Sequence, residues 1–188
     1  MTVGDLFRLL AAAFERAGIS YMLVGSYASN VWGVARATQD VDFLIAASPQ
    51  QIEAFLRQLP DADYYYDLAT AVEAAKCSDM FNILEMSSGL KIDLIFRKPT
   101  GFSQAEFQRR TQAEVEGVQV YVASAEDVVI SKLEWAKLGG SSRQIEDVAG
   151  IIKLRGNALD HSHIEKWVHD LGLFSEWDRA QRAAASIN

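Results

Sequence analysis

Two aspartates, Asp40 and Asp42, lie two residues apart in the strand-like segment "QDVDFLI" (39–45). Side chains two apart on a strand point to the same face, so these carboxylates would lie about 7 Å apart and repel each other. A third acid, Asp93, lies in the apolar run "KIDLIF" (91–96). Burying a carboxylate among apolar residues is unfavourable unless something compensates for its lost hydration. If the two strands are neighbours, the three carboxylates converge on one point.

Divalent cations would compensate such a cluster, since Mg²⁺ binds carboxylate oxygens and the oxygens of substrate phosphates. Two ions about 4 Å apart stabilise the attacking and leaving oxygens of a displacement at phosphorus. Asp40 and Asp42 would bridge the ions, and Asp93 would complete the ion nearer the attacking hydroxyl and help to deprotonate it. Lys91 shares a strand face with Asp93 and would offset its charge. The alternative is an edge strand whose acids face water and bind no ion.

A glycine and a serine, Gly25 and Ser26, stand between a strand-like and a helix-like segment, upstream of the paired acids. A helix N-terminus presents N–H groups and a partial positive charge to an anion. Glycine lets the backbone come close to the ligand. Such a junction alone is commonly just a turn, but followed by an Asp-x-Asp strand it indicates a phosphate site.

Hydrophobic periodicity predicts the elements that hold these residues. The expected elements are a helix at 3–17, a strand at 19–25, a short helix at 26–33, a strand at 40–47, a helix from Pro49 to about Leu59 with Ser48 as N-cap, a hairpin of strands at 80–86 and 90–98, and a strand pair within 113–123 that turns near Glu116 and Gly117. The segment 64–78 is ambiguous, with a weak preference for helix.

After residue 123 the pattern becomes purely helical. Helices are expected at 124–138, with Ser124 as N-cap, at 142–154, at 162–170 and at 174–186, the second of them burying Ile145, Val148, Ile151 and Ile152. We therefore predict an α/β (α+β) fold class: a mixed, twisted sheet flanked by helices in residues 1–123, and a C-terminal helical region in residues 124–188.

The composition of the 188-residue chain is that of an ordinary globular protein, with 49% hydrophobic and 23% charged residues. It has no long apolar run and no secretory pattern at its start, so we expect no membrane association. A single cysteine, Cys77, allows no internal disulfide, and we expect a cytoplasmic location. The net charge of −7 argues against broad electrostatic binding of nucleic acid.

The run "LVGSYASNVWGVARATQDVDFLI" (23–45) resembles the signature of the DNA polymerase β-like nucleotidyltransferase superfamily. That signature has a hydrophobic residue, Gly, then Gly or Ser, a spacer of about a dozen residues, and Asp-hydrophobic-Asp-hydrophobic. The spacer here, Tyr27 to Gln39, has thirteen residues and is at the long end of the pattern. "KIDLIF" supplies the third acid on a later strand, as in such proteins, and the motifs cover about residues 19–96.

The resemblance implies a nucleotidyltransferase fold and the Mg²⁺-dependent transfer of a nucleoside monophosphate from an NTP to a hydroxyl acceptor, with release of pyrophosphate. Asp40 and Asp42 become metal ligands and Asp93 the third catalytic carboxylate. The implied cofactors are two Mg²⁺ ions, with Mn²⁺ as an alternative. Gly25 and Ser26 become contacts to the β- and γ-phosphates. The first of the two regions would be the catalytic domain, and the helical region would pack on the nucleotide cleft.

Two basic residues, Lys132 and Arg36, are further candidates for nucleotide binding. Lys132 lies on an apolar helix face, either as a snorkelling lysine or, as in the similar AbiEii-type toxins, as a contact to the triphosphate. Those toxins place an acid in the next helix, here Asp147, although a surface pair with Arg143 is the favoured interpretation of that residue. Arg36 would either contact phosphate or acceptor, or be a solvated loop arginine.

The acceptor is left open between RNA and a small molecule. Resemblance to toxin-type members suggests a tRNA or other RNA end and a cognate antitoxin or toxin partner. The arrangement R-x-T-x-D-x-D (36–42) resembles lincosamide-resistance enzymes instead and suggests a small hydroxylated antibiotic. A rival hypothesis is a nucleotide-binding antitoxin or regulatory partner that keeps the fold without catalysis.

Overall fold

The structure, a computed structural model, describes residues 1–187 and separates into two compact units. The first unit comprises residues 1–27 and 37–122. The second comprises residues 28–36 together with the chain from residue 123 onward. None of the helices within the described residues combines the length and the apolar composition that a bilayer crossing demands.

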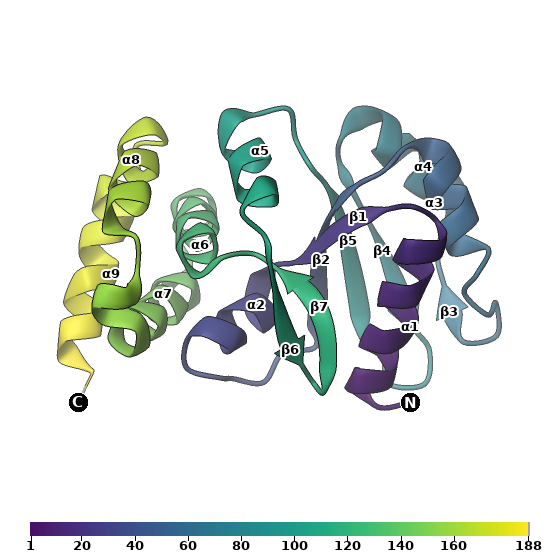
Figure 1. The fold of residues 1–188 in the computed structure, drawn as a ribbon, viewed down its shortest axis with the longest axis horizontal. Coiled ribbons are helices and arrows are strands. Elements are labelled where there is room, and N and C mark those ends of the chain that lie inside the picture. The colour runs from purple at the N-terminus through teal and green to yellow at the C-terminus, as the bar shows by residue number, and fades with distance from the viewer. Residues whose placement is uncertain (188) are drawn as a thin grey trace. The chain divides into compact units, whose positions relative to one another are not determined.

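A mixed sheet forms the centre of the first unit (Figure 1). Its seven strands, in the order β3-β4-β5-β2-β1-β7-β6, are β1 (Ser20–Leu23), β2 (Asp40–Ala46), β3 (Tyr64–Tyr65), β4 (Met80–Glu85), β5 (Lys91–Phe96), β6 (Thr111–Val115) and β7 (Val118–Val122). The pairs β2–β5 and β1–β7 are parallel, and the other neighbours are antiparallel. The predicted mixed sheet is therefore confirmed.

Helices pack on this sheet and connect its strands. They are α1 (Val3–Arg16), α3 (Pro49–Leu56), α4 (Leu68–Cys77) and α5 (Gly101–Gln108), and α2 (Gly25–Trp32) begins in this unit. The ring of Phe43 on β2 packs edge-on against Phe7 and Phe14 of α1 and Tyr21 of β1. Phe43 and its alternate neighbours on β2 therefore face α1, and Asp40 and Asp42 lie on the opposite face.

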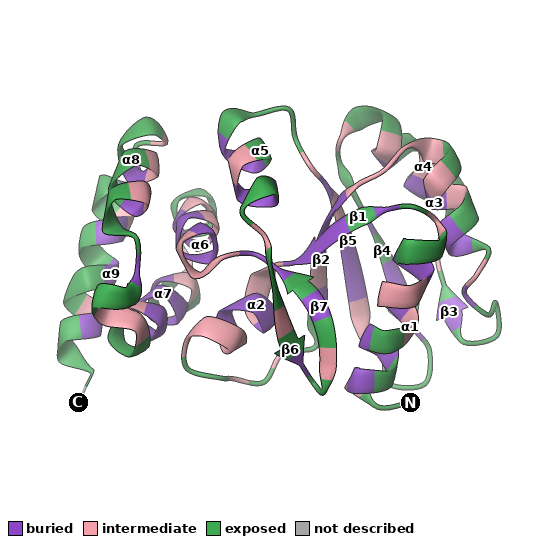
Figure 2. Ribbon diagram, in the orientation of Figure 1, coloured by how far each residue is buried: buried purple, intermediate pink, exposed green. Residues whose placement is uncertain are grey.

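The central strands β1, β2 and β5 are buried along most of their length (Figure 2). Burial on both faces explains why the sequences of β2 and β5 are nearly continuous hydrophobic runs, without an alternation of hydrophobic and polar residues. An acid in such a strand is unusual, and the acidic ends of β2 and β5 are therefore the feature that needs an explanation.

The hairpin between β4 and β5 turns on a buried carboxylate, that of Glu85, which is 1% exposed. The backbone N–H groups and hydroxyls of Ser87 and Ser88 all donate hydrogen bonds to it. Burial raises the pKa of Glu85, but these hydrogen bonds outweigh burial and lower the pKa to about 2. The carboxylate thus fixes the turn that sets the register of β5.

The second unit is helical, as predicted. After the end of α2 it consists of α6 (Ala125–Gly139), α7 (Ser142–Arg155), a 3₁₀ turn (Gly156–Ala158), α8 (His161–Asp170) and α9 (Phe174–Ser186). Helix α7 packs between α6 and α9. Of the four isoleucine and valine residues expected in its core, Ile152 is only half-buried.

Residues 28–36 belong to this helical unit because their side chains pack into it. The indole N–H of Trp32 donates to the carbonyl oxygen of Ala123 at 2.8 Å, and the Arg155 guanidinium lies 4.7 Å from the Trp32 ring centroid. A Cβ on Gly33 would come within 2.8 Å of the Ile151 side chain, so the backbone there touches α7.

Two local features differ from the expectation. The ambiguous segment 64–78 divides into the short strand β3 and the helix α4, which begins after Asp67 as N-cap. Helix α5 was not expected, because its eight residues are too few to show a helical period clearly.

Candidate active site

The parallel pairing of β2 with β5 brings three carboxylates to one face of the sheet. Asp42 lies opposite Asp93, and Asp40 lies opposite Lys91. Since side chains alternate along both strands, the three carboxylates and the Lys91 ammonium share this face. The two strands are neighbours, as the sequence hypothesis required, and the interpretation of the acids as an edge-strand decoration does not fit the central position of β2 and β5.

Asp93 is the most buried of the three acids, with a side chain that is 10% exposed. Its Oδ2 accepts a hydrogen bond from Lys91 Nζ at 2.9 Å. Its Oδ1 is buried and has no hydrogen-bond partner among residues 1–187. A buried charged oxygen without a partner costs on the order of 1–3 kcal/mol, so this atom is the position at which a cation would contribute most.

Lys91 is the counter-ion of the sheet face that carries Asp40, Asp42 and Asp93, which we call the acidic face. The hydrogen bond to Asp93 raises the pKa of Lys91, burial lowers it in part, and the charges of Asp93, Asp40 and Asp42 raise it further. All three carboxylates thus act on one ammonium group. The sequence hypothesis gave Lys91 only the charge of Asp93 to offset.

Gly25 places the start of α2 directly beside Asp42. The residue has φ +61°, and a Cβ on it would lie 2.1 Å from Asp42 Oδ2. The N–H of Val24 donates to the backbone carbonyl of Asp42 at 2.8 Å. Glycine is therefore required here both by the backbone conformation and by the space that the carboxylate fills. Ser26 follows in the first turn of α2.

The donor atoms of the acidic face suit a hard divalent cation, although its side chains are not arranged as in an assembled metal site. No group of three or more His, Cys, Asp or Glu among residues 1–187 is arranged as a metal site, and Lys91 holds one oxygen of Asp93. The donors are nonetheless all carboxylate oxygens, and one of them is buried and unpaired. Those are the ligands that Mg²⁺ and Mn²⁺ prefer.

A second charged cluster lies within the helical unit, around Asp147 on α7. Arg36 donates from Nε and Nη2 to the two oxygens of Asp147 at 2.8 and 2.9 Å, a bidentate pair. Lys132 Nζ on α6 donates to Asp147 Oδ2 at 2.7 Å and to Gln144 Oε1 at 3.0 Å. The side chain of Asn30 binds both the backbone N–H and the carbonyl of Arg36.

Arg36 and Lys132 bind the same carboxylate, that of Asp147, in a largely buried setting. Lys132 is 3% and Asp147 9% exposed. Burial raises the pKa of Asp147, but the hydrogen bonds and charges of Arg36 and Lys132 outweigh it and leave the pKa below its usual value. The favoured interpretation of Asp147 as a surface partner of Arg143 is therefore wrong. Lys132 does not snorkel and Arg36 is not a freely solvated loop residue, because both are bound to Asp147.

Asn82 is a residue of the acidic face that was not expected from the sequence. It lies on β4 opposite Asp93 in the antiparallel β4–β5 pair, so its side chain shares the face of that acid. Counting register outward from the predicted three-residue turn Ser87–Gly89 would have placed Ile83 opposite Asp93 instead, because the actual turn between the paired residues Glu85 and Leu90 is one residue longer.

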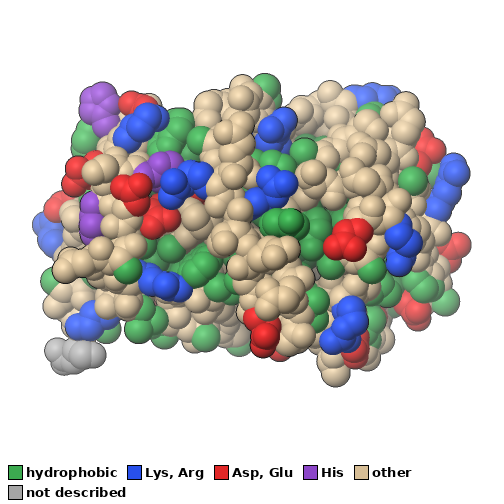
Figure 3. Space-filling view, in the orientation of Figure 1, with side chains coloured by type: hydrophobic (Ala, Val, Ile, Leu, Met, Phe, Trp, Pro, Cys, Tyr) green, Lys and Arg blue, Asp and Glu red, His purple; other side chains and the backbone are tan. Residues whose placement is uncertain are grey.

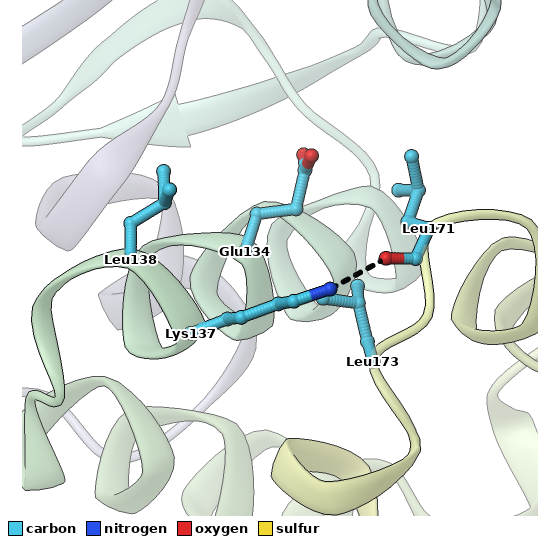
Figure 4. A pocket seen from close by; sticks show the side chains of 5 residues that line it. All are labelled: Glu134, Lys137, Leu138, Leu171 and Leu173. Atoms are coloured by element: carbon cyan, nitrogen blue, oxygen red, sulfur yellow. Dashed lines mark hydrogen bonds between the residues drawn. The ribbon is translucent and has the colours of Figure 1, made fainter.

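A cavity of about 170 Å³ lies in the helical unit (Figure 4). It is lined by Glu134, Lys137, Leu138, Leu171 and Leu173. Lys137 Nζ donates to the carbonyl oxygens of Leu171 and Gly172, both at 3.1 Å. Its ammonium thus caps the end of α8, and the other lining residues are three leucines and the acid Glu134, whose charge would repel the phosphates of a nucleotide.

An open mixed sheet with a Gly-Ser turn into a helix and acids on two adjacent strands defines the nucleotidyltransferase fold. The chain belongs to the family described as nucleotidyltransferase of unknown function (DUF6036), which it matches over residues 4–175. The predicted membership of the polymerase β-like nucleotidyltransferase superfamily is thereby confirmed. None of the curated proteins matches the chain.

Solved structures share the fold at low sequence identity. ANT(2")-Ia in complex with adenylyl-2"-tobramycin is 13% identical, with a TM-score of 0.58 over 92% of this chain and 97% of that one. An antigenic nucleotidyltransferase-like protein from Paracoccidioides brasiliensis is 17% identical, with a TM-score of 0.55 over 95% and 91%. A putative nucleotidyltransferase from H. pylori is 14% identical, with a TM-score of 0.53 over 97% and 90%.

Proposed function

We propose that this nucleotidyltransferase moves a nucleoside monophosphate from an NTP to a hydroxyl group, with release of pyrophosphate, and that Asp40, Asp42 and Asp93 hold its divalent cations. The observation that carries the proposal is the register of β2 and β5, which aligns Asp42 with Asp93 on one face. The unpaired Oδ1 of Asp93 supports it, because a cation would satisfy that buried oxygen.

The three acids divide the work by position. Bound Mg²⁺ or Mn²⁺ would supply positive charge to the attacking and leaving oxygens. Asp40 and Asp42, two apart on β2, would hold the cations that bind the nucleotide. Asp93 orients the acceptor and takes the proton of its hydroxyl on a carboxylate oxygen. The new bond joins the acceptor oxygen to the α-phosphorus, and the bond from that phosphorus to the β-phosphate oxygen breaks.

The phosphate groups of the NTP would be bound by backbone and basic side chains. Gly25 and Ser26 begin α2, and the N-terminus of a helix attracts phosphate through its N–H groups and dipole. We also assign Lys132 and Arg36 to the binding of the NTP phosphates, because ammonium and guanidinium groups form strong hydrogen bonds with phosphate oxygens.

The acceptor in this proposal is a small hydroxylated molecule. The net charge is −7, and basic and acidic side chains are interspersed on the face drawn in Figure 3, without a continuous basic surface. Binding along an RNA chain needs clustered Lys and Arg. The adenylyl-2"-tobramycin in the ANT(2")-Ia complex is a product of this chemical class on the same fold. We also propose that the protein works in the cytoplasm.

The test is nucleotidyl transfer by the purified protein. Each α-labelled NTP is incubated with Mg²⁺ or Mn²⁺ and either hydroxylated antibiotics or total RNA, and the labelled products are separated by size. We expect a small labelled product whose formation Asp42→Asn abolishes. Asp178→Asn, which makes the same charge change on an exposed residue of α9, should leave it unchanged. Label in RNA alone would overturn the acceptor class, and no label together with no calorimetric binding of Mg²⁺-NTP would overturn the function.

A further inference from the structure

Lys91 lies in the middle of the acidic face. It stands opposite Asp40 across the β2–β5 pair and two residues before Asp93 on its own strand. Its ammonium hydrogen-bonds to Asp93, the buried acid, rather than to Asp40, the exposed one. The contact therefore serves the carboxylate that loses most hydration on folding.

The Lys91 side chain is held in place by this contact and is not trapped by packing. It is 42% exposed, whereas the Asp93 side chain is 10% exposed. A lysine is a compact charge on a flexible four-carbon stem, so its ammonium can leave one partner without movement of the backbone. Asp93 has no such freedom, because it is buried on a central strand.

One carboxylate oxygen of Asp93 is thus available to a cation, and the other is hydrogen-bonded to Lys91. Oδ1 has no hydrogen-bond partner, and Oδ2 holds Lys91 at 2.9 Å. Full coordination by Asp93, or its approach to an ion shared with Asp42, requires the ammonium to move away, since like charges in this setting repel each other.

We propose that Lys91 is a displaceable counter-ion, which neutralises the acidic face in the cation-free protein and competes with the divalent cation for Asp93. Lys91 thereby sets the cation affinity of the site, and divalent cation replaces it there when substrate is bound. This inference rests on the proposed function, because it takes the acidic face as the cation site. Lys91 is in this view a positioning residue, because it acts on the reaction only through Asp93.

The test is Mn²⁺ titration of the full chain by calorimetry, without substrate. Lys91→Met removes the charge and keeps the length of the side chain, so we expect it to bind Mn²⁺ about fivefold more tightly than the unmodified protein. Lys91→Arg keeps a cation and should stay near the unmodified affinity. Lys76→Met is the matched control, because Lys76 forms an exposed pair with Glu73 and its loss makes the same charge change.

Thermal melting separates competition from a merely structural ion pair. In EDTA, Lys91→Met should melt below the unmodified protein, because the Lys91 charge no longer offsets the repulsion among the three carboxylates. Saturating Mn²⁺ should cancel or reverse that difference. A structural pair predicts a lower melting temperature in both conditions. Lys91→Gln provides a second variant if Lys91→Met does not fold in EDTA.

The outcomes distinguish this inference from the proposed function. Unmodified protein that binds Mn²⁺, together with an unchanged or weaker affinity in both Lys91→Met and Lys91→Gln, overturns the role of Lys91 and leaves the cation site standing. Absence of Mn²⁺ binding by the unmodified protein and by both variants overturns the two together.

Discussion

Gly25 and Asp42 are in such close contact that residue 25 has no room for a side chain: a Cβ there would lie 2.1 Å from Asp42 Oδ2. The glycine of the strand-to-helix turn and the second acid of the Asp-x-Asp strand therefore form one unit. The spacing of the sequence motif follows from this contact, because the chain between the two residues has to return to the same point.

Gly25→Ala should inactivate the protein by moving the Asp42 carboxylate. We expect nucleotidyl transfer to fall by at least about a hundredfold, as for other displaced catalytic groups, and Mn²⁺ affinity to fall with it. The positive φ of residue 25 adds a cost of about 1–2 kcal/mol in stability. Activity, Mn²⁺ calorimetry and melting temperature are measured together.

Gly89→Ala is the matched control, since Gly89 has φ +72° and no atom within 4 Å of its would-be Cβ. It should lose a similar amount of stability and no cation affinity. If both variants lose cation affinity equally, the contact between Gly25 and Asp42 has no role at the site.

Asp42→Asn should separate stability from function. Removing one of three facing carboxylates relieves repulsion, so the melting temperature without Mg²⁺ should stay the same or rise. With Mg²⁺ the unmodified protein should gain stability and the variant should not, because ligand binding stabilises the state that binds. Transfer should fall by about a thousandfold or more, since Asp42 would hold the cations that stabilise the attacking and leaving oxygens. Equal melting shifts with and without Mg²⁺ would contradict a cation site.

Asp147→Ala should destabilise the helical unit strongly. It leaves Lys132 buried without its carboxylate, and removal of one partner of a buried pair costs about 3–5 kcal/mol. The double variant Asp147→Ala with Lys132→Met should recover part of this loss, because the buried ammonium that loses Asp147 is removed as well. Urea unfolding of both single variants and the double variant gives the interaction energy. Strict additivity of the two single effects would show that the pair is not coupled.

Glu85 should give the protein a stability component that acid removes. Its folded pKa of about 2 is below the ordinary value of 4.5, so the component is fully present above pH 4.5 and is lost as the pH falls toward 2. The upper limit is about 3 kcal/mol. Urea unfolding between pH 3 and 6 should show a shallower pH dependence for Glu85→Gln than for the unmodified protein. Glu53→Gln, at an exposed pair with Arg57, should keep the original slope.

The sequence predicted the elements that carry local signals. Ser48 and Pro49 begin α3 with a capping box, and the β4–β5 hairpin turns through Ser87–Gly89, as expected. The strand pair β6–β7 turns at Glu116 and Gly117, which both have positive φ. These features depend on residues within one turn of one another, and so does the pattern that reveals them.

Features set by distant residues were harder to predict. Asp147 is 111 residues from Arg36, and only the packing of the helical unit brings the two together. Sequence distance favoured Arg143, four residues away on the same helix, and tertiary structure overrode that preference. Position in the sheet likewise decides the partners of Asp93, because β5 lies between β2 and β4. Strand alternation predicted a shared face for the acids only on the condition that their two strands are neighbours, and the family signature made that condition an expectation.

The helical unit includes nine residues, 28–36, from the N-terminal half of the chain. Trp32 and Arg36, which bind Ala123 and Asp147, are among them. A gene fragment that starts at residue 123 would therefore encode an incomplete core and should aggregate or be degraded on expression. The helices cannot be exchanged between relatives as a C-terminal cassette unless the segment from α2 to Arg36 is transplanted with them.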